Sequence, residues 1–155
     1  MTDWPAPRLA PPDPASLDAN QQAAHDAIAS GPRGSVRGPL AVWLHRPELA
    51  QRAQALGAYC RYGTLLPPRL SELAIISVAK VWESEYEWYA HKKLALEAGV
   101  APEVVEAIRT GAEPPFADPT ESLVHRFAIT AHRERRVPDA LYDEAVELLG
   151  QMGKT

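Results

Sequence analysis

The sequence predicts an all-α protein, a compact bundle of about seven helices preceded by an extended proline-rich arm. Prolines account for 15 of the 155 residues. They recur where helices would begin, and glycines recur where helices would end. Apolar residues between these positions follow helical spacing, and few runs of β-branched residues are present to indicate strands. These observations together predict helices throughout the chain.

The composition predicts a soluble globular protein. Hydrophobic residues make up 46% and charged residues 23% of the chain, with a formal net charge of −4. Acidic and basic residues are intermixed, so no basic footprint for nucleic acid is present. No stretch approaches the ~18 apolar residues of a membrane span, and the first residues do not resemble a secretion signal. We therefore expect a cytoplasmic protein with no nucleic-acid or membrane partner.

The first part of the chain is predicted to be an arm followed by a helical domain. Five prolines among the first 14 residues predict an extended arm over residues 1–15, lying on the surface or on a neighbouring subunit. We expect residues 16–155 to form a single helical domain. Its first helix is predicted over residues 18–30, and a short apolar segment follows at residues 40–44.

The next predicted helix contains the only cysteine of the chain. It begins at Pro47 and ends at Tyr62, before a glycine. Its apolar residues at helical spacing are Leu49, Ala53, Leu56 and Cys60. We interpret Cys60 as a small core residue. A single cysteine excludes an internal disulfide, a Cys-x-x-Cys redox pair and a cysteine-rich zinc site.

The second half of the chain predicts five more helices, with a bend near Trp82 between the first two. Their expected ranges are 69–81, 83–98, 102–109, 118–135 and 138–149. Prolines or Pro-Pro pairs precede or open four of them, as expected for the first helical position.

Polar residues interrupt the apolar faces of the helices around residues 69–98. At 100° per residue, Glu72 shares a face with Ile75 and Ile76, whereas Glu87 and His91 share a face with Trp88 and Ser84. Glu87 precedes His91 by four residues, so its carboxylate can select which imidazole nitrogen carries the proton. Buried carboxylates beside an imidazole can supply both an acid and a base near neutral pH. The alternative is a structural ion pair around a satisfied core histidine.

Three segments resemble the carboxymuconolactone decarboxylase family, whose superfamily also contains the alkylhydroperoxidase D proteins. They are Pro67-Pro-Arg-Leu-Ser-Glu-Leu-Ala-Ile-Ile76, Glu87-Trp-Tyr-Ala-His91 and Ala98-Gly-Val-Ala-Pro102. The resemblance extends upstream to Leu40 and downstream to Gly150. It implies an alkylhydroperoxidase D-like helical bundle, but the family hosts several activities.

The peroxidase branch of this superfamily uses a Cys-x-x-Cys-x-x-x-His motif that follows a glutamate. On that pattern Glu72 takes the place of the glutamate and His91 that of the histidine, whereas Ser84 and Glu87 stand where the two cysteines would be. A hydroxyl and a carboxylate cannot form a disulfide. Thiol peroxidase activity by that mechanism is therefore excluded.

The decarboxylase branch implies loss of CO₂ from a small carboxylated lactone or related unsaturated acid, without a cofactor or metal. In that reaction His91 would supply a proton to carbon, Glu87 would orient His91, and Glu72 would hold a proton or position the ring. Arg69 would pair with a substrate carboxylate, unless it binds Glu72 or caps its helix. Ser84 and Trp88 complete the predicted substrate-binding set, with core packing as the alternative for Trp88.

The resemblance also implies a homo-oligomer, a trimer or a hexamer. Family members usually continue after the Leu-Leu-Gly element into a further apolar helix, whereas this chain stops at Thr155, so we expect a truncated or altered end or an uncovered last helix. A non-catalytic ligand-binding or structural oligomer on the same scaffold is the second hypothesis. Peroxidase activity is the third.

Overall fold

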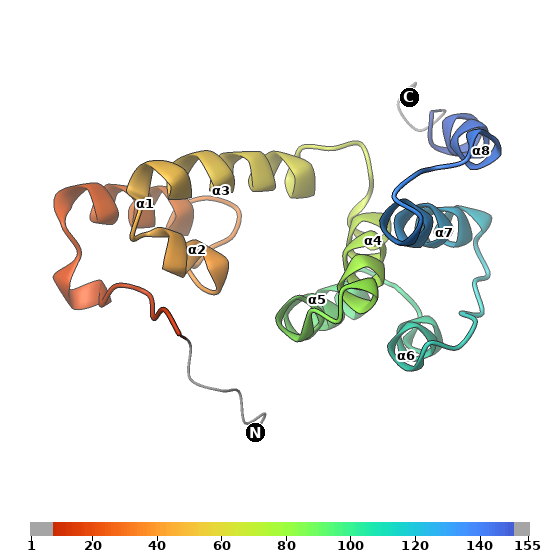
Figure 1. Ribbon diagram of the computed structural model, residues 1–155, viewed down its shortest axis with the longest axis horizontal. Coiled ribbons are helices and arrows are strands. Elements are labelled where there is room, and N and C mark those ends of the chain that lie inside the picture. Colours follow the sequence, from red (N-terminus) through yellow and green to blue (C-terminus); the bar gives the residue numbers. More distant parts are fainter. Residues whose placement is uncertain (1–7, 151–155) are drawn as a thin grey trace. The chain divides into compact units, whose positions relative to one another are not determined.

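The computed structural model describes residues 8–150. The regular secondary structure of these residues is entirely helical, which confirms the all-α prediction (Figure 1). One 3₁₀ turn, Pro14–Ser16, precedes eight α-helices, α1 to α8. The helix not predicted as such is α2, Pro39–Trp43, which occupies the expected apolar segment. None of the helices in residues 8–150 is both long enough and apolar enough to cross a membrane. The predicted arm lies partly outside the described residues, and its described part carries no α-helix.

The chain divides into two compact units, with the boundary after Gly63. This boundary falls inside the region predicted as a single domain. The single-domain assignment for residues 16–155 stays a prediction.

The first unit contains α1 (Ala19–Ala29), α2 and α3 (Pro47–Tyr62), with α1 and α2 both packed on α3. A capping box opens α1, because the Asp18 side chain accepts from the Gln21 amide at 2.8 Å and the Gln21 side chain accepts from the Asp18 amide at 2.9 Å. The buried core of this unit consists of Ala24, Ile28, Leu44 and Ala50. His45 Nε2 donates to the Ala10 carbonyl at 2.7 Å and so holds the end of the arm.

The interpretation of Cys60 as a core residue is wrong, because the predicted apolar stripe of α3 faces outward. Leu49 and Leu56 are 49% and 67% exposed, and Cys60 is exposed. The small-residue face of α3 is the packed one. A Cβ at Gly57 would lie 2.8 Å from the end of the flexible Arg33 side chain, which would have to shift to make room for it.

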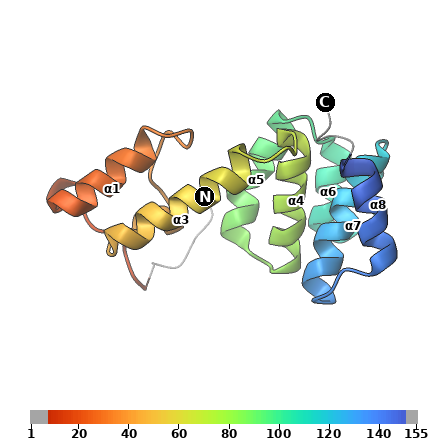
Figure 2. The same cartoon turned by 90° about the horizontal axis from the view of Figure 1, so that it is seen from above.

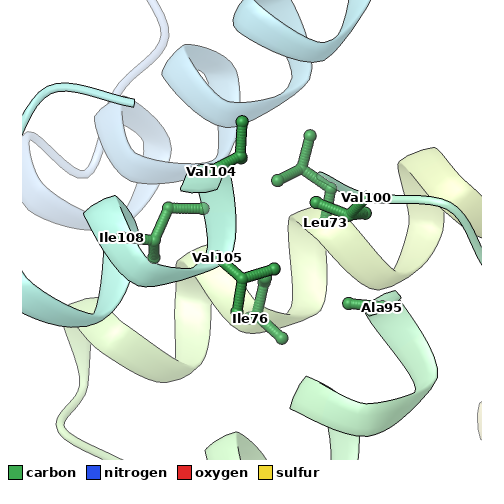
Figure 3. Packing of buried hydrophobic residues seen from close by; sticks show 7 residues of the cluster. All are labelled: Leu73, Ile76, Ala95, Val100, Val104, Val105 and Ile108. Atoms are coloured by element: carbon green, nitrogen blue, oxygen red, sulfur yellow. The ribbon is translucent and has the colours of Figure 1, made fainter. Parts of the chain in front are cut away.

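The second unit contains the remaining five helices. They are α4 (Pro68–Val81), α5 (Glu85–Glu97), α6 (Pro102–Thr110), α7 (Pro119–Arg133) and α8 (Asp139–Leu149). α4 is central, because it packs against α5, α6 and α7, and α8 packs against α7 (Figure 2). The core joins α4, α5 and α6 through Leu73, Ile76, Ala95, Val100, Val104, Val105 and Ile108 (Figure 3).

The bend predicted near Trp82 is confirmed. α4 ends at Val81 with Trp82 as its C-cap residue, and Glu83 has a φ of 49°, which no residue of a right-handed helix adopts. α5 therefore begins two residues later than predicted. The Trp82 indole donates to His132 Nδ1 at 2.9 Å and fixes the bend against the end of α7.

A buried polar network also connects α4 to α7. The Ser77 hydroxyl donates to the Leu73 carbonyl at 2.7 Å, so His125 Nδ1 donates to the Ser77 oxygen at 2.8 Å. The His125 ring packs at a tilt against Phe116. Burial lowers the pKa of His125.

Candidate active site

Glu72 contributes a buried carboxylate to the interface between α4 and α5. Its side chain is 7% exposed, as the helical periodicity predicts. Neighbouring α4 residues Leu73 and Ile76 belong to the core, so the helix cannot turn Glu72 toward solvent without exposing them. The fold therefore buries the Glu72 carboxylate, which needs a hydrogen-bonding or charged partner there.

His91 of α5 provides that partner. His91 Nδ1 lies 2.6 Å from Glu72 Oε2, and its side chain is 12% exposed. A carboxylate accepts hydrogen bonds, so Nδ1 carries the hydrogen and donates to Glu72. This contact fixes the orientation of the ring and directs Nε2 away from Glu72.

Glu87 lies on the other side of the imidazole. Its Oε2 is 3.5 Å from His91 Nε2, one helical turn away on α5, and the Glu87 side chain is 41% exposed. The sequence pairs His91 with Glu87, whereas the shorter contact of His91 is with Glu72 on the neighbouring helix. An imidazolium in this place can interact with one carboxylate through each nitrogen.

Arg69 contacts acidic residues of α7. Its Nη2 donates to Asp118 Oδ2 at 2.7 Å, and its Nη1 donates to Glu121. The hydrogen bond to Asp118 raises the pKa of Arg69, and the same contact with Arg69 lowers the pKa of Asp118. Neither acid was predicted from the sequence. The available signal for Asp118 was its position before Pro119, whereas Glu121 lies between Thr120 and Ser122 in the first turn and gave no such signal.

The other two predicted site residues lie near the start of α5. Ser84 is the N-cap residue of that helix, is half-buried, and makes no side-chain capping hydrogen bond. Trp88 is partly buried and packs against the core cluster of α4 and α6. The structure thus brings Glu72, Glu87 and His91 together, engages Arg69 with α7, and places the Trp88 ring in packing.

Across residues 8–150, no three side chains of His, Cys, Asp or Glu are grouped closely enough to hold a metal ion.

Comparison with protein families matches residues 47–130 to the Carboxymuconolactone decarboxylase family. The matched region covers more than half of the chain, from the start of α3 into α7. The chain belongs to the carboxymuconolactone decarboxylase family. The resemblance in the sequence motifs is confirmed, and all six predicted site residues fall inside the matched region. Neither the curated proteins nor the solved structures contain a match to this family member.

Proposed function

We propose that this family member is a lyase that removes CO₂ from a small carboxylated lactone or related unsaturated acid. Two findings support the proposal. One is membership of the carboxymuconolactone decarboxylase family. The other, which carries the mechanism, is the His91 imidazole held at 2.6 Å by the buried Glu72 carboxylate with Nε2 facing Glu87.

The reaction requires a place for electrons and a proton for carbon. The bond between the carboxylate and its carbon breaks, and the electron pair enters the unsaturated lactone as CO₂ leaves. The resulting carbanion-like intermediate then takes one proton at carbon. A general acid placed at that carbon typically accelerates such a step by about 10²–10⁴-fold.

His91 Nε2 is the atom that we assign to this proton transfer. Nδ1 is engaged with Glu72, so the exchangeable proton of the imidazolium is the one on Nε2. The Glu72 carboxylate accepts from Nδ1 and so holds the ring in place during the transfer. The Glu87 side chain is 41% exposed and its Oε2 lies 3.5 Å from Nε2, so it would pass a proton from solvent to the ring after each turnover.

The two alternative functions, a thiol peroxidase and a non-catalytic scaffold, require different residues. Thiol peroxidase chemistry needs a cysteine pair, but Ser84 and Glu87 occupy those positions, and Cys60 is exposed on α3 with no second cysteine in the chain. A non-catalytic scaffold needs no proton transfer at all. The held imidazole with a water-facing carboxylate favours the enzyme over the scaffold.

The direct test is CO₂ release by the wild-type protein. The purified chain is incubated with an unsaturated γ-lactone that carries a carboxylate, and in parallel with hydrogen peroxide and a dithiol. We expect one CO₂ per lactone consumed and no peroxide consumption. No turnover across a panel of carboxylated lactones would favour the binding scaffold, and peroxide consumption that disappears in Cys60→Ser would favour the peroxidase.

We also propose that the chain works as a homo-oligomer, a trimer or a hexamer. Large apolar side chains are exposed on two helices, including Leu56 and Tyr59 on α3 and Tyr142 and Val146 on α8. Such surfaces are commonly covered by another subunit. Light scattering after size-exclusion chromatography should give a multiple of the mass of one chain, and a single-chain mass would contradict the proposal.

A further inference from the structure

The side chain of Arg69 is 34% exposed, and its guanidinium is bound by two acidic residues at the start of α7. Its guanidinium donates to Asp118 at 2.7 Å and to Glu121, and Glu121 is buried. A buried carboxylate that loses its cation is left uncompensated, so this ion pair is costly to open. A substrate carboxylate would therefore compete with two protein carboxylates that already bind Arg69.

The position of Arg69 on α4 gives this contact a structural effect. α4 begins at Pro68, directly after Pro67, and has no side-chain cap on its first amides. Uncapped helix ends tend to fray. Arg69 attaches this first turn to the start of α7, where Asp118 also caps the helix by accepting from the Thr120 amide at 2.8 Å.

Arg69 also lies beside the end of α5. A Cβ at Gly99 would be 3.7 Å from Arg69 Cδ, and Gly99 has a φ of 96°, so a side chain there would be strained. α5 is the helix of His91. A single side chain on α4 is thus placed against both the helix of His91 and the start of α7.

Glu72 follows Arg69 by three residues on the same helix. Its 2.6 Å contact with His91 is made between α4 and α5, so a movement of the first turns of α4 by about an ångström would take the pair outside hydrogen-bonding distance. We propose that Arg69 is a positioning residue that keeps Glu72 directed at His91, and that it does not bind substrate. Its effect on the rate depends on the proposed function, whereas its effect on the Glu72–His91 contact does not.

The kinetic test uses Arg69→Met, which keeps a long stem without the charge. Decarboxylation kinetics should show kcat lowered roughly 10- to 100-fold with KM changed by less than about twofold, because misplaced catalytic groups cost rate while substrate contacts stay intact. An increase in KM with kcat unchanged would assign Arg69 to the substrate carboxylate and overturn the proposal.

A second readout needs no substrate. The Nδ1 proton of His91, which is hydrogen-bonded to Glu72, should give a downfield resonance in the NMR spectrum of the wild-type protein. This resonance should be lost or broadened in Arg69→Met. Its persistence unchanged in a folded Arg69→Met protein would contradict the positioning role, even if no lactone were turned over by any variant.

Two further variants complete the test. Arg126→Met removes another arginine of α7, which binds Glu144 of α8 far along the helix from Asp118, and should leave kcat and the His91 resonance as in wild type. Asp118→Asn keeps an oxygen to cap α7 but removes the charge that binds Arg69. Asp118→Asn should change kcat and the His91 resonance in the same direction as Arg69→Met, and by less. If Arg126→Met changed them as much as Arg69→Met does, the response would be a general loss of packing, and the proposal would be overturned.

Discussion

The imidazole of His91 lies between two carboxylates that differ in their exposure to water. Glu72 is buried and 2.6 Å from Nδ1, whereas Glu87 is half-exposed and 3.5 Å from Nε2. A charge-assisted hydrogen bond strengthens as its partners leave water, so the contact with the buried carboxylate should be the stronger of the two. The two glutamates therefore have unequal parts in the proposed chemistry.

This inequality predicts unequal effects of removing each charge. Glu72→Gln should lower kcat/KM for decarboxylation by about 10- to 100-fold, the equivalent of a lost charged hydrogen bond, and Glu87→Gln should lower it by less. Steady-state kinetics of the two variants at matched protein stability measures the difference. A larger loss in Glu87→Gln would place the decisive carboxylate on the solvent side of the ring.

His125 makes folding stability depend on pH. Because burial lowers the pKa of His125, the unfolded chain binds a proton more readily than the folded chain does below about pH 6.5. The contribution of His125 is complete above that pH and is lost as the pH falls through the pKa of the folded state. Urea unfolding at pH 7.5 and pH 5.5 should show a smaller pH difference in His125→Gln than in wild type.

Arg133 and Glu113 also act on His125, Arg133 lowering its pKa and Glu113 raising it. Asp118 should cause a second loss of folding stability at more acidic pH. Arg69 lowers the pKa of the Asp118 carboxyl, so the stability contributed by this ion pair is lost as the pH falls through the pKa of Asp118 in the folded state. An unchanged pH difference between wild type and His125→Gln would show that the buried histidine is not the group that titrates in the upper range.

The helix starts follow from the prolines, because proline fixes φ and lacks the amide hydrogen that the first helical turn leaves unpaired. α3 and α6 begin at Pro47 and Pro102 as predicted. The misplaced boundaries have a common cause in positive φ at residues other than glycine: 49° at Glu83 delays α5, and 56° at Arg135 follows the early end of α7. No residue type at these positions signals that conformation.

The candidate site was partly predictable from helical periodicity. Helical periodicity places Glu72 on an inward face and places Glu87 near His91, and both hold in the structure. The closer pairing of His91 with Glu72 depends on how α4 packs on α5. Likewise, the acids that bind Arg69 lie about fifty residues along the chain, and only the packing of α7 on α4 brings them there.

Glycine at the end of α6 gives a prediction at the scale of one helix. Gly111 has a φ of 78° with open space where a Cβ would be, so Gly111→Ala should lower the free energy of unfolding by about 1 kcal/mol through backbone strain alone. Gly31 after α1 has no positive φ, and a Cβ there meets its nearest atoms at an ordinary 3.5 Å. Urea unfolding should show a smaller loss in Gly31→Ala, and equal losses would remove strain as the cause.

At the scale of the whole molecule, the family match and the two compact units divide the chain differently. The match begins with α3 of the first unit and extends into α7 of the second, so the family segment includes parts of both. All six predicted site residues lie in the second unit. The proposed reaction is therefore assigned to residues of the second unit, whereas the proposed association between chains includes the exposed apolar face of α3 in the first unit.

The measurement that tests this account most directly compares His91→Gln with His132→Gln. CO₂ release from a carboxylated lactone should fall by about 10²–10⁴-fold in His91→Gln, the contribution of a general acid, while its circular dichroism spectrum stays that of wild type. His132→Gln, which keeps an acceptor for the Trp82 indole on α7, should retain wild-type turnover. Turnover by His91→Gln at the rate of the His132→Gln control would contradict the assignment of His91 as the proton donor.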